Sequence, residues 1–122
     1  MPTRLVIPTN DQNGTEIADH FGRSAYFAVI DLDDAGKTTG VNVHPNTGEH
    51  SGGRGHAHDN ILVHDPNVVI VRGMGPRGIM SFQSQHIAVL QANSNSVKEL
   101  VTSFARHELH ELTEGCAEAH HK

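Results

Sequence analysis

The chain has 122 residues, of which 36% are hydrophobic and 4% aromatic, and a formal net charge of −5. This length suits one domain with a single, mainly aliphatic core. The negative charge argues against nucleic-acid binding, and the single cysteine excludes an internal disulfide. No apolar run of about 18 residues and no signal-peptide pattern is present. We therefore expect a cytoplasmic protein without a membrane span, present as a monomer or weak dimer.

The first half of the chain predicts three strands. Arg4–Pro8 is a short apolar run, and Ala25–Asp31 is rich in residues that favour strands. Asp33–Lys37 has the aspartates and glycine of a tight turn, so Thr38–His44 is expected to return antiparallel to Ala25–Asp31. Residues 46–55 contain four glycines and no apolar residue, which predicts a mobile loop.

The second half alternates helices with buried strands. The sequence predicts a short helix over His56–His64, then a strand over Val68–Val71, which is apolar throughout. The loop Gly73–Gly78 precedes a short helix over Ile79–Ser84, and His86–Leu90 is expected to form another buried strand.

A longer helix is predicted over Ser96–Leu112, capped by Ser94 or Ser96 and followed by a disordered tail over residues 114–122. One apolar stripe at helical spacing supports this helix, consisting of Val97, Val101, Phe104, Ala105, Leu109 and Leu112. Strands alternating with helices after an N-terminal hairpin indicate an α/β fold within one domain over residues 1–113. The mixed sheet would have five strands, antiparallel in the N-terminal hairpin and parallel for the C-terminal strands.

Eleven histidines make metal binding the first functional question, because imidazole is the commonest metal ligand. His50, His56 and His58 lie in the glycine-rich loop, where they are candidate metal ligands together with Asp59. No standard zinc-finger spacing is present. A polar loop that merely tolerates histidine is the alternative interpretation.

The C-terminal residues Cys116, His120 and His121 form a second candidate, because a thiolate with two imidazoles suits soft transition metals. His107 and His110 are three residues apart, whereas a zinc-protease helix needs a spacing of four. We therefore assign these two histidines to a solvated helix face. His44, His64 and His86 receive no assignment.

Two glycine turns are candidate anion sites. Gly73, Gly75 and Gly78 match a dinucleotide fingerprint between a strand and a helix, with Arg77 beside them. The next strand ends without the acidic residue that a dinucleotide site needs, so an anion cradle or a tight turn fits better than a nucleotide cofactor.

The second turn is His20-Phe21-Gly22-Arg23, in which a histidine and an arginine flank a glycine. Both side chains donate hydrogen bonds, so they are able to hold an anion between them. In the alternative interpretation Phe21 belongs to the core, Gly22 makes a turn and Arg23 is solvated.

Enzymatic activity is not expected. The only cysteine lies in the predicted tail, away from a preorganised histidine partner. The predicted first strand, Arg4–Pro8, carries none of the carboxylates that a two-metal nuclease would need there.

Several segments together resemble the dinitrogenase iron–molybdenum cofactor biosynthesis family. They are Ile17–Arg23 followed by Phe27–Asp31, then the histidine- and glycine-rich loop, and finally Val69–Gly78. The resemblance implies a three-layer ribonuclease-H-like fold and a small cluster-binding protein, as in the orange-protein-like members. It assigns cofactor binding to His20, Phe21, Gly22, Arg23, Gly73, Met74, Gly75 and Arg77.

The expected function is non-enzymatic binding or carriage of an anionic metal–sulfur cluster of the Fe/Mo or Mo/Cu type. Cluster donor or acceptor proteins would be its partners, and His50, His56 or His58 would close over the cluster. One alternative is a histidine-based buffer or sensor for Zn, Ni or Cu. Another is a regulatory domain that binds an anion or nucleotide through the glycine loop alone.

Overall fold

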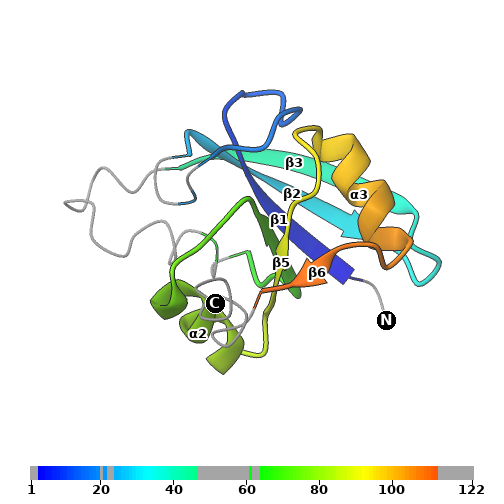
Figure 1. The fold of residues 1–122 in the computed structure, drawn as a ribbon. Helices are drawn as coiled ribbons and strands as arrows, with labels where there is room; N and C mark the ends of the chain where they lie inside the picture. The colour runs from blue at the N-terminus through cyan, green and yellow to red at the C-terminus, as the bar shows by residue number, and fades with distance from the viewer. Residues whose placement is uncertain (1–2, 20, 22–23, 47–60, 62–63, 113–122) are drawn as a thin grey trace.

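A computed structural model describes residues 3–19, 21, 24–46, 61 and 64–112 of the chain. Strands and helices alternate along the second half of the described chain, as Figure 1 shows. In chain order the elements are β1 (Thr3–Thr9), β2 (Tyr26–Leu32), β3 (Thr38–Pro45), β4 (Val68–Val71), α2 (Pro76–Ser84), β5 (Ala88–Gln91), α3 (Val97–Ala105) and β6 (His110–Glu111).

The strands form one mixed sheet in the order β3-β2-β1-β4-β5-β6. β1, β4 and β5 are parallel, whereas β2 and β3 pair antiparallel beside β1. These pairings confirm the antiparallel hairpin and the parallel C-terminal strands. The prediction of five strands was wrong, because β6 adds a sixth strand, antiparallel to β5. With two residues, His110 and Glu111, β6 is too short to show a hydrophobic pattern.

The core has two halves, one on each face of the sheet. Along β1, Val6 packs in a cluster with Phe82 of α2, whereas Leu5 packs in a second cluster with Leu100 of α3. Successive side chains of a strand point to opposite faces, so one strand contributes to both clusters. α2 and α3 therefore cover opposite faces, which gives the three layers visible in Figure 1.

α2 begins earlier than the sequence predicts. Pro76 occupies the start of the helix, and Gly75 precedes it in an extended conformation. Proline is favoured at the first helical position because its missing N–H has no partner there in any case. The predicted loop Gly73–Gly78 is therefore wrong at its end, since Gly78 lies inside α2.

α2 is terminated by a histidine with a left-handed backbone, two residues after Ser84. His86 has φ 65°. The two closing hydrogen bonds of a Schellman motif run from Ile87 N to Phe82 O (3.0 Å) and from His86 N to Gln83 O (3.0 Å). Glycine is usual at this position, and histidine is among the few other residues that tolerate it.

α3 is capped by Ser96, whose side chain accepts a hydrogen bond from Glu99 N, and it ends at Ala105. The predicted helix over Ser96–Leu112 is therefore too long. His107 has φ 60°, and Glu108 N donates to Ser103 O (2.9 Å), which closes a second Schellman motif. His107 and His110 are exposed, but neither lies on a helix face.

The apolar stripe of the predicted helix divides after α3. Val97, Val101, Phe104 and Leu109 pack in the α3 cluster, whereas Leu112 packs on the opposite face in the α2 cluster. Most of the predicted loop over 46–55, most of the predicted helix His56–His64 and the whole tail 114–122 lie outside the described residues. The ribonuclease-H-like class of the fold stays a prediction.

Candidate functional site

The carboxyl ends of β1, β4 and β5 lie at the same edge of the sheet, because these strands are parallel. After β4 the chain continues to α2 on one face, and after β5 it continues to α3 on the other. Such a divergence leaves a crevice, which is where open α/β sheets bind ligands. A hollow of about 410 Å³ lies there, lined by Arg72 and by residues 91–95. We call it the carboxyl-end crevice.

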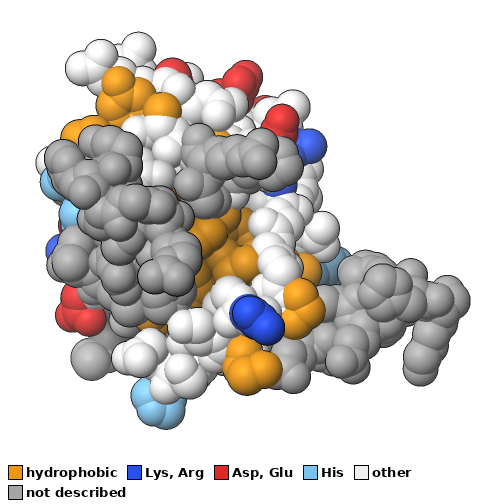
Figure 2. Space-filling model, turned by 90° about the vertical axis from the view of Figure 1, so that its left-hand side faces the viewer, with side chains coloured by type: hydrophobic (Ala, Val, Ile, Leu, Met, Phe, Trp, Pro, Cys, Tyr) orange, Lys and Arg blue, Asp and Glu red, His pale blue; other side chains and the backbone are white. Residues whose placement is uncertain are grey.

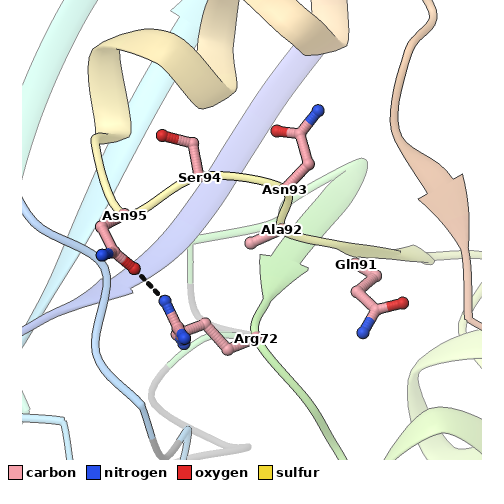
Figure 3. A pocket seen from close by; sticks show the side chains of 6 residues that line it. All are labelled: Arg72, Gln91, Ala92, Asn93, Ser94 and Asn95. Atoms are coloured by element: carbon pink, nitrogen blue, oxygen red, sulfur yellow. Dashed lines mark hydrogen bonds between the residues drawn. The ribbon is translucent and has the colours of Figure 1, made fainter.

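Arg72 joins the chain segments around this crevice. Its Nε lies 3.2 Å from Asp19 Oδ1, and one terminal nitrogen donates to Asn95 Oδ1. Figure 3 shows the side chains of Arg72 and Asn95 directed toward one another. A guanidinium has five N–H donors. These two contacts therefore leave donors available, and the arginine is exposed.

The β1–β2 connection is tied to the β5–α3 connection by backbone hydrogen bonds. Ile17 N donates to Asn95 O, and Val97 N donates to Thr15 O, both at 3.0 Å. Asp11 orders the same connection, because its carboxylate accepts from the Thr15 hydroxyl (2.6 Å) and backbone N–H (3.0 Å). These bonds, with the Thr15 hydroxyl first, lower the pKa of Asp11. The ordered connection thereby positions Asp19 next to Arg72.

Gly73 and Gly75 are not required by the backbone or by packing. Neither has a positive φ, and a Cβ built on either meets no described atom within 4 Å. Gly78 differs, because a Cβ there would lie 2.8 Å from Met74 Sδ. The tight-turn alternative therefore does not account for the first two glycines. Their open backbone permits close approach of a ligand.

The start of α2 adds backbone donors beside this open loop. The helix has no side-chain cap at Gly75 and no acidic residue in its first turn. The first N–H groups of a helix lack internal partners and carry partial positive charge, which favours anions. Arg77 is exposed, and its side chain makes no hydrogen bond or ion pair with the residues that the structure describes.

One described residue from each predicted turn packs on the α2 face of the sheet. Phe21 and Met74 both pack against the α2 cluster. Phe21 lies edge-on to Phe82 at 5.7 Å between ring centroids and 6.4 Å from Phe27. Phe21 is therefore a partly buried residue at the edge of the core. Figure 2 shows hydrophobic side chains at the surface on the side where the β4–α2 connection lies, with basic groups at their margin.

The other predicted site residues lie outside the described residues. They are His20, Gly22, Arg23, His50, His56, His58, Cys116, His120 and His121. Within the described ranges, no group of three or more His, Cys, Asp or Glu side chains is arranged to hold a metal ion.

Sequence reasoning missed Arg72, Asp19 and Asn95. Arg72 directly follows a buried strand, and Asn93, Ser94 and Asn95 form a polar run shortly after the next one. Both are signals of a ligand-facing edge in an α/β protein. The glycine fingerprint drew attention to Arg77 instead.

Solved structures with the same fold define the class of protein, which is a small α/β domain. A Methanocaldococcus jannaschii protein provisionally assigned as a dinitrogenase is 18% identical, with a TM-score of 0.74 over 92% of this chain and 96% of that one. The apo form of the Desulfovibrio gigas orange protein is 19% identical, with a TM-score of 0.75 over 90% and 92%. A Thermotoga protein provisionally assigned as NifB is 21% identical, with a TM-score of 0.68 over 91% and 94%.

The family follows from the sequence itself. Residues 1–107 match the family described as dinitrogenase iron-molybdenum cofactor, so the chain belongs to that family. No curated protein matches the chain significantly. None of the described helices has both the length and the apolar character to cross a membrane.

Proposed function

We propose that this protein is a non-enzymatic carrier that binds an anionic metal–sulfur cluster in the carboxyl-end crevice. Family membership supports a role connected with the iron–molybdenum cofactor. The observation that carries the placement is Arg72, a cation at the carboxyl end of β4 that contacts both neighbouring connections. The cluster would be cargo, received from a donor protein and passed to an acceptor.

The groups around the crevice suit an anion that already has its own sulfide ligands. The lining supplies hydrogen-bond donors, namely the Arg72 guanidinium and the side-chain amides of Gln91 and Asn93. The uncapped first turn of α2, which begins four residues after Arg72, would add backbone amides. Concavities lined by backbone N–H groups bind phosphates and iron–sulfur centres in many proteins. We therefore propose that the cluster is held by charge-assisted hydrogen bonds.

The proposal extends to residues around the crevice. His20 and Arg23 would add donors from the predicted turn that contains Phe21, which packs against the α2 cluster. Arg77 would contribute from the first turn of α2. His50, His56 and His58 would close over the cluster, and Cys116, His120 and His121 would capture metal at the end of the chain.

Anaerobic purification, with metal and sulfide analysis and a visible spectrum, tests this function. Molybdenum, iron or copper with sulfide-to-metal absorption supports the carrier. A colourless protein without molybdenum, iron or sulfide would contradict it, and zinc that is lost when His50, His56 and His58 are replaced would favour the histidine-based buffer. Metal-free protein that binds inorganic phosphate at the glycine loop would favour the anion-binding regulatory domain.

Three arginine variants test the placement. Arg72→Ala and Arg77→Ala should each lose cluster while keeping the wild-type circular dichroism spectrum. Arg106→Ala removes the same charge from the C-terminal end of α3 and should retain the cluster. Equal occupancy in all four proteins would contradict the placement in the crevice.

A further inference from the structure

His44 and His64 form a pair of side chains that the crevice does not use. Their ring centroids lie 4.4 Å apart at an interplanar angle of 31°. His44 comes from β3, and His64 comes from the segment that precedes β4. Both are half-buried, so the rings are packed but still reached by solvent.

The backbone on both sides of the pair is fixed. His44 lies opposite Phe27 in the β2–β3 ladder. His64 N donates to Ile61 O (3.0 Å), and its carbonyl accepts from the Arg4 guanidinium (2.7 Å). Arg4 is held in turn by Asp31 Oδ1 at 2.8 Å. The two rings are therefore brought together by the fold, which lowers the ordering cost of a shared ligand.

The surroundings of His64 favour its neutral form, and the charge of the nearby Arg4 is itself paired with Asp31. Burial, followed by the proximity of His44 and Arg4, lowers the pKa of His64. A neutral imidazole keeps a nitrogen lone pair free for a metal.

We propose that His44 and His64 form a two-histidine site for a borderline divalent cation such as Zn²⁺, with water completing its coordination. Imidazole suits Zn, Ni and Cu, whereas Mg and Ca prefer oxygen ligands. Two Zn–N bonds of about 2.0–2.1 Å in a tetrahedral site separate the nitrogens by roughly 3.3 Å. The ring centroids are 4.4 Å apart, so both side chains would have to turn about their side-chain bonds until one nitrogen of each ring faces the ion.

Site-resolved NMR of the full chain tests the pair directly, because other histidines also bind zinc. With Zn²⁺ alone as the probe at neutral pH, the ring resonances of His44 and His64 should shift together and saturate. His44→Ala should weaken binding at His64 by at least about tenfold, since losing even an outer-shell partner costs 10–100-fold. His64→Ala should do the same at His44.

Two matched variants give the controls. His110→Ala removes an exposed histidine of β6 and should leave the titration of the pair unchanged. Arg72→Ala should also leave it unchanged, which separates this site from the carboxyl-end crevice. The proposal would be overturned if zinc shifted the resonances of other histidines but not those of His44 and His64. It would also be overturned if the shift at one of the two rings persisted after the other was removed. The wild-type titration decides the question even if a variant fails to fold.

Discussion

The molecule contains two arginine–aspartate pairs whose surroundings differ. Arg4 pairs with Asp31 at 2.8 Å, and Arg72 pairs with Asp19 at 3.2 Å. The two arginine side chains are almost equally exposed, at 41% and 42%, but Asp31 is 32% exposed and Asp19 is 76% exposed. Arg4 lies near the amino end of β1, whereas Arg72 follows the carboxyl end of β4, so the pairs mark opposite edges of the parallel strands.

The partners show what each arginine does. Arg4 bonds to strand β2 through Asp31 and to the carbonyl of His64, and its backbone exchanges hydrogen bonds with Asn67. Among the described residues, the Arg72 side chain bonds to Asp19 and Asn95, which lie in connections between elements. It lies near open glycines and an uncapped helix in the chain. The same residue type therefore joins structural elements at one edge and keeps donors available at the other, where we propose that the cluster binds.

The largest effect that separates the two edges is expected in ligand binding. Arg72→Ala should weaken binding of the dianion tetrathiomolybdate by about tenfold to a hundredfold, the worth of a hydrogen bond to a charged group. Arg4→Ala should change the affinity by less than about twofold, since Arg4 lies at the other edge. Anaerobic absorption titrations measure both, and equal losses would break the distinction.

The loss of stability should have the reverse order, with a larger loss for Arg4→Ala than for Arg72→Ala. Arg4→Ala should lower the free energy of unfolding by about 1 kcal/mol, because it removes an ion pair and leaves the His64 carbonyl without its donor. Arg72→Ala should cost about 0.5 kcal/mol or less, because Asp19 is mostly exposed. Urea denaturation with an unchanged m-value checks this. A larger cost for Arg72→Ala would contradict it.

The helix ends at the amino edge offer a gain in stability. His86→Gly should raise the free energy of unfolding by about 0.5–1 kcal/mol. The left-handed backbone costs a residue with a Cβ roughly 1–2 kcal/mol, which glycine avoids. The greater freedom of glycine in the unfolded chain offsets part of this gain. The affinity for tetrathiomolybdate should not change. Thermal and urea unfolding measure the gain, and a loss of stability would show that the His86 ring makes a compensating contact.

Substitution of the open glycines at the carboxyl edge should affect ligand binding more than stability. Gly73→Ala and Gly75→Ala should leave the free energy of unfolding within about 0.5 kcal/mol of wild type or raise it slightly, because no described atom opposes the new methyl group. Each should weaken tetrathiomolybdate binding if the ligand lies against this backbone. Unfolding and titration of the same samples test both statements. Unchanged affinity in both variants would remove the loop from the site.

The smallest effect is a pH dependence at the amino edge. Burial lowers the pKa of His64 below its ordinary 6.5, so the unfolded chain binds this proton more readily than the folded chain. The free energy of unfolding should therefore decrease as the pH falls through and below about 6.5. His64→Gln should reduce this slope when the metal is removed with a chelator. An unchanged slope would assign the dependence to other groups.

The sequence predicted those elements whose patterns are local. The buried strand β4 matches its apolar run, and the hairpin follows from the turn at Asp33–Lys37. The apolar spacing of α3 continues through Leu109 and Leu112 although the helix ends at Ala105, because those leucines pack from an irregular segment onto opposite faces. No glycine marks that end, since His107 takes the left-handed position.

The candidate site was only partly accessible to the same reasoning. Gly73 and Gly75 carry a recognisable spacing, and their place between a strand and a helix was predicted. Arg72 lies 53 positions after Asp19 and 23 positions before Asn95 in the sequence, although its side chain contacts both. Such contacts depend on the strand order, which places three connections at one edge.

Chemical-shift mapping with tetrathiomolybdate tests the central claim most directly. Under anaerobic conditions, the backbone amides of Arg72, Gly73, Gly75 and Asn95 should shift in a saturable manner, with much smaller changes at Arg4 and His86. This result would place the anion at the carboxyl ends of the parallel strands. Shifts centred on Arg4 and His86, or no saturable shift at the carboxyl edge, would contradict the account.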